Sequence, residues 1–119
     1  ALPRAHGQAH GLLVADVAQT DALREAVAAL AAEAPVHLLV NNTAGPPGGP
    51  IRDAAQDAFL DTFRKHLLAN HALAQALLPG MRAVGYGRIV NIVSTSVYEP
   101  IAGLGVSNTI RGAVAAWAK

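Results

Sequence analysis

Three short apolar runs along the chain are each followed at once by small polar residues. They are residues 12–15 before Asp16, residues 36–40 before Asn41, and residues 89–93 before Ser94. A short, mostly apolar run is typical of a strand buried on both faces of a parallel sheet. Ligands of open α/β sheets bind beyond the carboxyl ends of the strands, so we expect a binding site where these three runs end.

Helices are predicted after the first and the third run. Thr20 or Asp21 can cap a helix that ends near Pro35, and its apolar residues recur on one stripe that would pack on the sheet. Another helix is expected after Ser107 or Asn108, and the sequence stops before that helix has a visible end.

The longest predicted helix follows the second run. Asp53 and Gln56 form an approximate capping box at its start. The helix should run to about Leu78, where Pro79 and Gly80 would terminate it. Strands and helices then alternate along the whole chain, which predicts a parallel α/β sheet.

Composition and charge restrict the function classes. The chain has 119 residues, of which 52% are hydrophobic and 14% charged, so it is too apolar for a disordered segment. Its net charge is +1 and its basic residues are scattered, which argues against a nucleic-acid partner. No apolar stretch is long enough for a membrane span. Together with the absence of cysteine, these features lead us to predict a soluble, cytoplasmic protein.

Four segments resemble one known family. Asp16-Val17 resembles an adenine-contacting pair, and residues 41–45 are similar to an Asn-Asn-Ala-Gly strand end. Residues 75–81 resemble the close of a long helix, and residues 87–94 resemble the strand that delivers a catalytic serine. In this order and spacing they resemble the short-chain dehydrogenases/reductases, most closely the branch named 3-oxoacyl-acyl-carrier-protein reductases.

This resemblance implies a doubly wound parallel α/β sheet, the Rossmann fold, incomplete at both ends in this chain, that binds NADP or NAD. The cofactor would move a hydride to a small-molecule carbonyl substrate or from an alcohol. The implied cofactor-binding residues are Asp16, Val17, Asn42, Thr43, Ala44 and Arg111. The resemblance also implies a homodimer or homotetramer that assembles through the long helix and the last helix.

The catalytic positions implied by the resemblance have changed residue type. Ser94 matches the family's serine, but Ser107 stands where the tyrosine is expected and Arg111 where the lysine is expected. His66 stands at the position of the family's helix asparagine. An aliphatic hydroxyl is a far weaker acid than a phenol, whose pKa is near 10, so Ser107 is a poor proton source. Arg111 suits binding of ribose hydroxyls or a phosphate better than proton relay.

Two other side chains offer a proton in place of the missing tyrosine. His66 has an ordinary pKa near 6.5, and Tyr98 lies on the loop after Ser94. A histidine on the apolar side of a helix is, however, more often a hydrogen-bonded core residue than an acid. Both proton sources are therefore hypotheses.

Plainer interpretations apply to other candidates. Asp16 could cap the next turn, and Asn41 and Asn42 could satisfy turn backbone. His6 and His10 have a spacing seen in metal sites, but without further ligands we assign no metal. A stripe of large apolar residues on the long helix is expected to be core or subunit interface; it comprises Phe59, Phe63 and Leu67.

The family's first strand and its glycine-rich phosphate turn would precede this sequence. We therefore expect residues 1–119 to be the central part of a single Rossmann-type domain, in a protein of about 250 residues with sequence missing at both ends. The run at residues 12–15 would pair with a strand that this chain lacks. The isolated piece should be inactive.

Three functions remain open from the sequence. The first is an NAD(P)-dependent carbonyl reductase or alcohol dehydrogenase with an altered acid. The second is a dinucleotide-binding homologue with little or no catalysis, which the residues at positions 66, 107 and 111 favour. The third is another Rossmann enzyme, such as a methyltransferase in which Asp16 binds a ribose.

Overall fold

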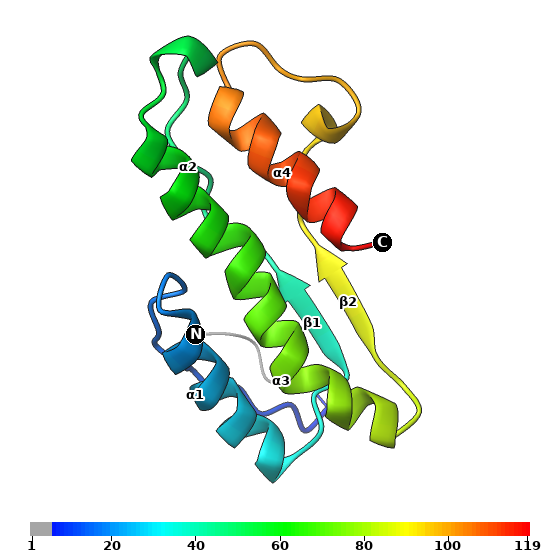
Figure 1. Ribbon diagram of the computed structural model, residues 1–119. Helices are drawn as coiled ribbons and strands as arrows, with labels where there is room; N and C mark the ends of the chain where they lie inside the picture. The colour runs from blue at the N-terminus through cyan, green and yellow to red at the C-terminus, as the bar shows by residue number, and fades with distance from the viewer. Residues whose placement is uncertain (1–5) are drawn as a thin grey trace.

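The computed structural model describes residues 6–119 (Figure 1). Two strands and a layer of helices make up this part of the chain. The strands are β1 (Leu38–Asn41) and β2 (Arg88–Asn91). The helices and helical turns are α1 (Thr20–Glu33), η1 (Ile51–Asp53), α2 (Gln56–Phe63), η2 (Arg64–Leu68), α3 (Ala69–Ala83), η3 (Thr95–Val97) and α4 (Gly105–Trp117).

The two strands pair in parallel, with Leu38 opposite Arg88 and Asn41 opposite Asn91. The predicted common direction of these two strands is confirmed. Because they are neighbours in register, the segments that follow Asn41 and Asn91 leave the sheet side by side. A ligand site is expected at this edge of the sheet.

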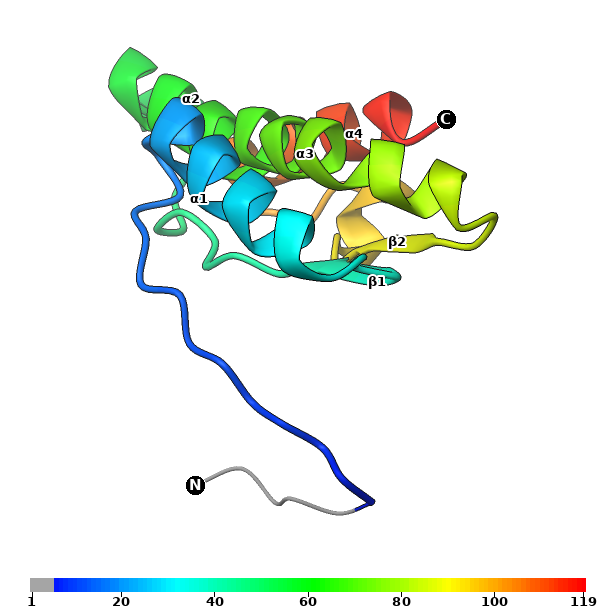
Figure 2. The same ribbon diagram turned by 90° about the horizontal axis from the view of Figure 1, so that it is seen from below.

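The helices cover one face of the sheet (Figure 2). Leu39 and Ile89 pack against the helical core, whereas Leu38, Val40 and Val90 on the opposite face are exposed. This alternation follows from the two-residue period of strands. The described residues form a small parallel α/β sheet with one covered face, and the doubly wound arrangement stays a prediction for a longer protein.

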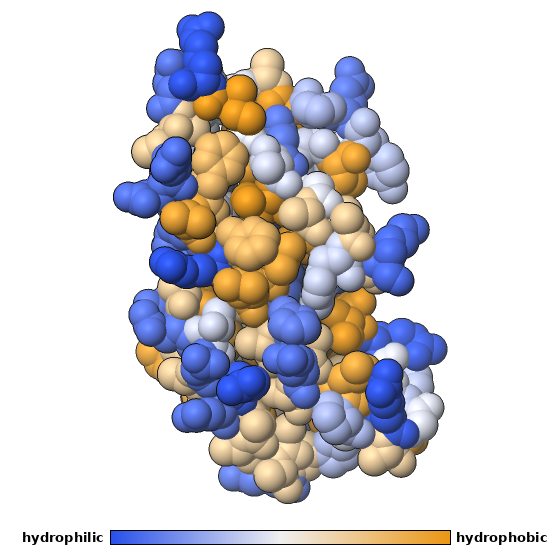
Figure 3. Space-filling view, in the orientation of Figure 1, coloured by the Kyte–Doolittle hydropathy of each residue, from blue (hydrophilic) through white to orange (hydrophobic). Residues whose placement is uncertain are grey.

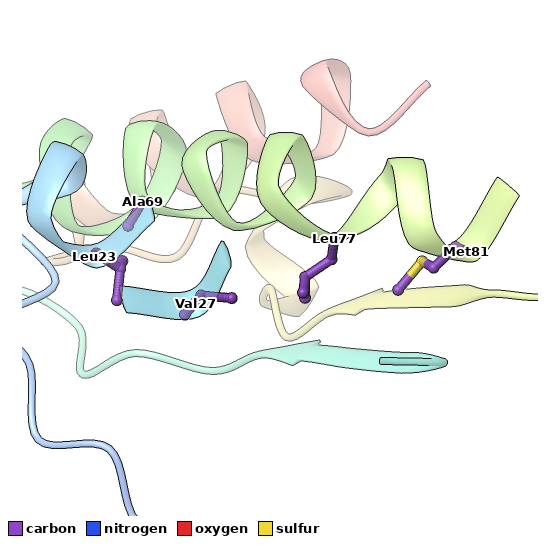
Figure 4. Close-up of a cluster of buried hydrophobic side chains, with 5 residues drawn as sticks. All are labelled: Leu23, Val27, Ala69, Leu77 and Met81. Atoms are coloured by element: carbon purple, nitrogen blue, oxygen red, sulfur yellow. The ribbon is translucent and has the colours of Figure 1, made fainter. Parts of the chain in front are cut away.

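The core lies between α1, α3 and the sheet (Figure 4). Five buried side chains form its centre: Leu23, Val27, Ala69, Leu77 and Met81. Leu23 and Val27 belong to the predicted stripe of α1, which confirms that this stripe packs inward. Leu77 and Met81 are one helical turn apart on α3 and are only 3% and 4% exposed.

The predicted strand at residues 12–15 is wrong for the described structure. This segment has no strand conformation and forms part of a tail that runs away from the body (Figure 2). Leu12 and Val14 are 90% and 87% exposed. A strand needs a hydrogen-bonding neighbour, and the sheet formed by residues 6–119 contains only β1 and β2.

The long helix starts later than predicted. Asp53 lies in the short turn η1 and does not cap α2, which begins at Gln56 after Ala55 without a side-chain cap. The capping box is therefore wrong. The helix then continues without a break through η2 into α3, so residues 56–83 form one helical rod.

The predicted stop at Pro79-Gly80 is also wrong, because α3 continues to Ala83. Pro79 lacks one backbone donor, but Leu77 and Met81 on either side of it are held in the core. Gly85, which has a φ of 69°, follows the C-cap residue and terminates the helix. The Gly85 and Tyr86 amides donate to the carbonyls of Arg82 and Met81, which is the Schellman pattern.

The starts of the two other helices also differ from the predictions. Thr20 is the first residue of α1 rather than its cap, and the preceding Gln19 makes no side-chain cap hydrogen bond. The last helix, α4, begins at Gly105, so Ser107 lies inside its first turn. Backbone bonds made before each helix, such as Gln19 N–H to the Asp16 carbonyl, replace the expected side-chain caps.

The middle of the rod is a π-helical turn, η2, which holds His66. The Ala69 amide donates to the carbonyl of Arg64, five residues earlier. Just before this turn, the Thr62 hydroxyl donates to the Ala58 carbonyl at 2.6 Å. A side-chain bond of this kind often accompanies a local change in helix geometry.

Candidate functional site

Three asparagines join the strand ends to the long helix. Asn41 and Asn91 are register partners, and the Asn41 Nδ2 donates to the Asn91 Oδ1 at 2.8 Å. Asn70 of α3 donates to the same oxygen at 3.5 Å. This cluster was not predicted from the sequence, although the amide of Asn70 on an otherwise apolar stripe was a signal for a buried polar contact. The cluster fixes the ends of β1 and β2, and therefore the points at which the two following segments leave the sheet, relative to α3.

The loop after β1 is bound to the π-helical turn by His66. The His66 Nδ1 lies 3.0 Å from the Thr43 hydroxyl, and its Nε2 lies 3.1 Å from the Ala44 carbonyl oxygen. His66 is only 5% exposed. The structure thus brings together three residues predicted from the sequence, two from the loop and one from the helix.

These two contacts select one form of the neutral imidazole. A carbonyl oxygen can only accept, so the Nε2 carries the proton and donates to Ala44. The Nδ1 then accepts from the Thr43 hydroxyl. Burial lowers the pKa of His66 and the nearby Arg111 guanidinium lowers it further, while the bond to Ala44 raises it. The single N–H is directed at backbone, so His66 is poorly placed to protonate a substrate.

The lowered pKa of His66 predicts a pH-dependent stability. Folding disfavours the charged imidazole, so this contribution is complete above the unfolded pKa near 6.5 and declines as the pH falls from there toward the folded pKa. Arg111 and the Lys65–Asp61 pair are the charged groups nearby. The free energy of unfolding in urea should decrease between pH 8 and pH 5.5, and it should decrease less in the His66→Gln variant than in the parent protein. Equal losses would contradict the prediction.

Arg111 on α4 connects the two strand exits. Its Nη1 donates to the carbonyl of Ile92, just beyond β2, at 2.8 Å. A Cβ built on Gly45, in the loop after β1, would lie 3.5 Å from its Nη2. Its Nε donates to the hydroxyl of Ser107, one turn earlier, at 3.3 Å. The predicted Ser107 and Arg111 are therefore neighbours at the site.

Arg111 carries a charge that no carboxylate balances within residues 6–119. The ion pairs of this part of the chain are made by Arg24, Arg52 and Lys65. An unbalanced, half-buried guanidinium favours an anion or a group with several oxygens as its ligand. The arrangement can therefore hold a phosphate, a ribose or a carboxylate.

The loop after β2 carries the predicted serine. The Ser94 hydroxyl accepts from the Ser96 amide at 3.1 Å and caps η3, so its own proton is free to donate elsewhere. Turn η3 packs against α4, which brings this loop next to the helix of Ser107 and Arg111. Tyr98 on the same loop is 92% exposed. For Tyr98 to reach a substrate, the loop would have to move.

The remaining cofactor-binding candidates lie apart from these contacts. An Asp16 oxygen accepts from the Ala18 amide at 2.9 Å, which is the capping role considered above. Val17 packs against the core cluster. Asn42 is exposed at the exit of β1. Among residues 6–119 no hydrogen bond or ion pair links Asp16 to His66, Ser94 or Arg111.

The two exit loops are joined further out. Gly49 and Leu104 form an isolated parallel bridge, in which the Gly49 amide donates to the Gly103 carbonyl at 2.6 Å. A cavity of about 330 Å³ lies beneath the first loop, with Ala44, Pro47, Lys65 and His66 in its wall. The candidate site is thus framed by two connected loops, the π-helical turn and α4.

The family described as short chain dehydrogenase matches residues 2–119. The chain belongs to this family. Family membership favours the first two functions considered above over a methyltransferase.

Relatives of this short-chain dehydrogenase are similar over parts of their length. A Streptomyces coelicolor protein named "Putative ketoacyl reductase" is 40% identical over 63 residues, which cover 51% of this chain and 24% of that protein. The structure of a short-chain dehydrogenase from Streptomyces avermitilis is 27% identical, with a TM-score of 0.83, and 88% of this chain matches 39% of it.

A gluconate 5-dehydrogenase from Burkholderia cenocepacia, solved in complex with NADP and tartrate, is also similar. It is 27% identical with a TM-score of 0.79, and 86% of this chain matches 40% of that protein. This chain therefore spans about two fifths of the length of these solved structures, in line with the expected part of a longer protein. The small parallel sheet corresponds to a part of their fold.

Two further observations on this short-chain dehydrogenase concern metal ions and membrane spans. Within residues 6–119, His, Asp and Glu side chains form no group of three that could hold a metal ion. In the same range, none of the helices has the length and apolar character needed to cross a membrane.

Proposed function

We propose that the protein carrying this chain is an NAD(P)-dependent oxidoreductase that reduces a carbonyl, such as a 3-oxoacyl group, or oxidises an alcohol. Residues 1–119 are then the central part of its Rossmann-type dinucleotide-binding domain. In a longer chain, further helices would cover the sheet face that exposes Leu38, Val40 and Val90, which gives the doubly wound fold. The domain would be cytoplasmic.

One observation supports this function above the others. The parallel exits of β1 and β2 place Gly45 and the Ile92 carbonyl on either side of Arg111. The backbone of both exit loops therefore lies next to the Arg111 guanidinium, at the edge where open α/β sheets bind ligands. The family to which the chain belongs contributes the identity of the ligand.

The residues present fit a dinucleotide. Arg111 retains two Nη2 donors and an unbalanced charge, which suit ribose hydroxyls or a phosphate. Asn42, Thr43 and Ala44 line the exit beside it, and Asp16 with Val17 would meet the adenine end. NADP or NAD would supply the hydride. The NADP-bound gluconate 5-dehydrogenase supports NADP as the first cofactor to test.

The hydroxyls of Ser94 and Ser107 would hold the substrate oxygen. Ser107 accepts from Arg111 and Ser94 accepts from the Ser96 amide, so each keeps its own proton for donation. Hydrogen bonds of this kind stabilise a developing oxyanion. Neither hydroxyl is a good acid, so we assign the proton to solvent that reaches the site, with His66 and Tyr98 as the alternative proton sources.

A second function is favoured by the contacts of the substituted residues. Ser107 is bound to Arg111, and the one N–H of His66 is bound to Ala44. A site without a strong acid could bind the dinucleotide and catalyse little. We therefore keep a catalytically weak dinucleotide-binding homologue as the alternative.

The apolar surface suits self-association. Figure 3 shows hydrophobic side chains gathered over the long helix and α4. Leu60 and Phe63 of this rod are exposed, and Phe59 and Leu67 are only partly buried. We propose that this face forms the interface of a homodimer or homotetramer, which agrees with the stripe expected as core or subunit interface.

Cofactor binding tests the proposal. The full-length protein should bind NADPH or NADH in a fluorescence titration, and binding should weaken at least tenfold in Arg111→Met, because one charge-assisted contact contributes about 1.5–3 kcal/mol. Arg24→Met, on the exposed surface of α1, is the matched control and should not change binding. Preferential binding of S-adenosylmethionine, or of no nucleotide, would overturn it. Measured reduction of a ketone then distinguishes the proposed oxidoreductase from the catalytically weak homologue.

A further inference from the structure

We infer that His66 is a positioning residue that fixes the loop after β1 in its cofactor-binding shape by donating to Ala44 and accepting from Thr43. This inference rests on the proposed function for its consequence, but its structural part stands on contacts within the chain. It gives His66 a role other than the proton source considered from the sequence.

The contacts of His66 are made by both ring nitrogens to adjacent residues of one loop. The Nδ1 lies 3.0 Å from the Thr43 hydroxyl, and the Nε2 lies 3.1 Å from the Ala44 oxygen. Two bonds from one rigid ring to adjacent residues restrict both the position and the tilt of that peptide. A single flexible amide could not reach both atoms with the same geometry.

The support on the helix side is rigid. His66 is buried and sits in η2, between α2 and α3. One helical turn further on, Ala69 and Asn70 are also buried, Ala69 in the core cluster and Asn70 against Asn91 at the end of β2. The ring is thus held by a part of the rod that is itself fixed to both strands.

The held loop leads directly to the charged group of the site. Gly45 follows Ala44 and lies against the Nη2 of Arg111. A displacement of the Ala44 peptide would carry Gly45 toward or away from this guanidinium. A cofactor that contacts Arg111 would also lie against the backbone of Ala44 and Gly45. The position of this loop therefore determines how well the cofactor fits.

Two substitutions separate the bonds of the ring. In His66→Asn the short amide can reach only the position of Nδ1 and so keep the contact to Thr43. In His66→Gln the amide nitrogen can reach the position of Nε2 and keep the contact to Ala44. Thr43→Val removes one hydroxyl with little change of shape. His71→Gln, on an exposed position of α3, is the matched control.

Nuclear magnetic resonance of the imidazole nitrogens in the full-length protein is the first readout. We expect the neutral form with the proton on Nε2, and in Thr43→Val a changed Nδ1 shift with the Nε2 proton retained. A ring that exchanges between both neutral forms, or that carries its proton on Nδ1, would overturn the inference. This readout needs no cofactor.

The second readout is the NADPH dissociation constant together with kcat and KM. Each His66 variant and Thr43→Val should raise the dissociation constant about 2- to 13-fold, the loss expected for one hydrogen bond. The pH profile of kcat should keep its shape, because His66 supplies no proton. A pH profile of kcat that loses a titration in the His66 variants alone would show that His66 acts as an acid and would overturn the inference.

The two readouts separate the inference from the proposed function. If the parent binds neither NADPH nor NADH, the proposed function fails, and the imidazole resonances alone decide whether the ring holds the loop. If the parent binds NADPH and the variants bind it equally well while remaining folded, the positioning role fails and the proposed function stands.

Discussion

Replacing Ser107 by tyrosine together with Arg111 by lysine should raise the rate of carbonyl reduction by about 10²- to 10⁴-fold, the usual contribution of a positioned general acid. The two residues are one turn apart on α4 and already touch each other at 3.3 Å. Ser107 lies in the first turn of that helix, and the turn η3 that follows Ser94 packs against the same helix. A phenol at this position would therefore project toward the same region as the Ser94 hydroxyl.

The physical reason is the acidity of the group at position 107. A phenol has an ordinary pKa near 10, and a neighbouring ammonium lowers it because opposite charges favour ionisation. Arginine at position 111 supplies the charge but spends one N–H on Ile92 and another on Ser107. Lysine gives a compact charge that can lie closer to the phenol oxygen.

The matched control is Ser107→Phe with Arg111→Lys, which adds the same ring without its hydroxyl. NADPH consumption by the full-length proteins with a ketone substrate gives the rates, and cofactor dissociation constants show whether binding has changed. A gain in both double variants would mean that shape, not acidity, limits the reaction. No gain in either would contradict the assignment of position 107 to the reacting oxygen.

Gly105→Ala should destabilise the protein by about 1–3 kcal/mol, the usual cost of overpacking a filled space. A Cβ at this position would lie 2.7 Å from the Ile51 Cα and would also meet the Ile51 side chain. Since one of the clashing atoms is backbone, a new rotamer of Ile51 cannot relieve the contact. Either η1 or the start of α4 must shift.

The shift should also reach the site, because the Gly105 amide donates to the Gly49 carbonyl at 3.4 Å within the bridge between the two loops. Ser107 is only two residues further along α4. We therefore expect weaker cofactor binding beside the lower midpoint of urea unfolding.

The control for this substitution is in the same helix. Gly112→Ala meets no atom within 4 Å. Alanine is the better helix former, so this change should stabilise the protein by roughly 0.5–1 kcal/mol. If Gly105→Ala proved as stable as Gly112→Ala, the close approach of η1 to α4 would be contradicted.

Local sequence patterns predicted those parts of the fold that depend on burial. The stripe of α1, the parallel pair of β1 and β2, and the proximity of Ser107 to Arg111 follow from hydrophobic period and helical spacing. The stop at Pro79 failed because packing of Leu77 and Met81 outweighs one lost backbone bond. The strand at residues 12–15 failed because strand formation requires a neighbour.

The site was predictable as a list of residues but not as a set of contacts. Thr43, Ala44 and His66 were each identified, yet only the structure shows the imidazole between the other two. The Asn70–Asn91 contact joins residues 21 positions apart and depends on the height of the rod above the sheet. Neither the hydrophobic period nor the spacing of residues along the sequence determines the distance between the rod and the sheet.

The π-helical turn allows one helical rod to pack against two different helices, α4 and α1. It adds one residue relative to an α-helical path, which rotates everything after it by roughly 100° about the helix axis. As a result α2 and η2 pack on α4, while α3 packs on α1. Deleting a single residue there would turn the inward side of α3 away from α1, so the length of this segment sets which surfaces of the molecule can meet.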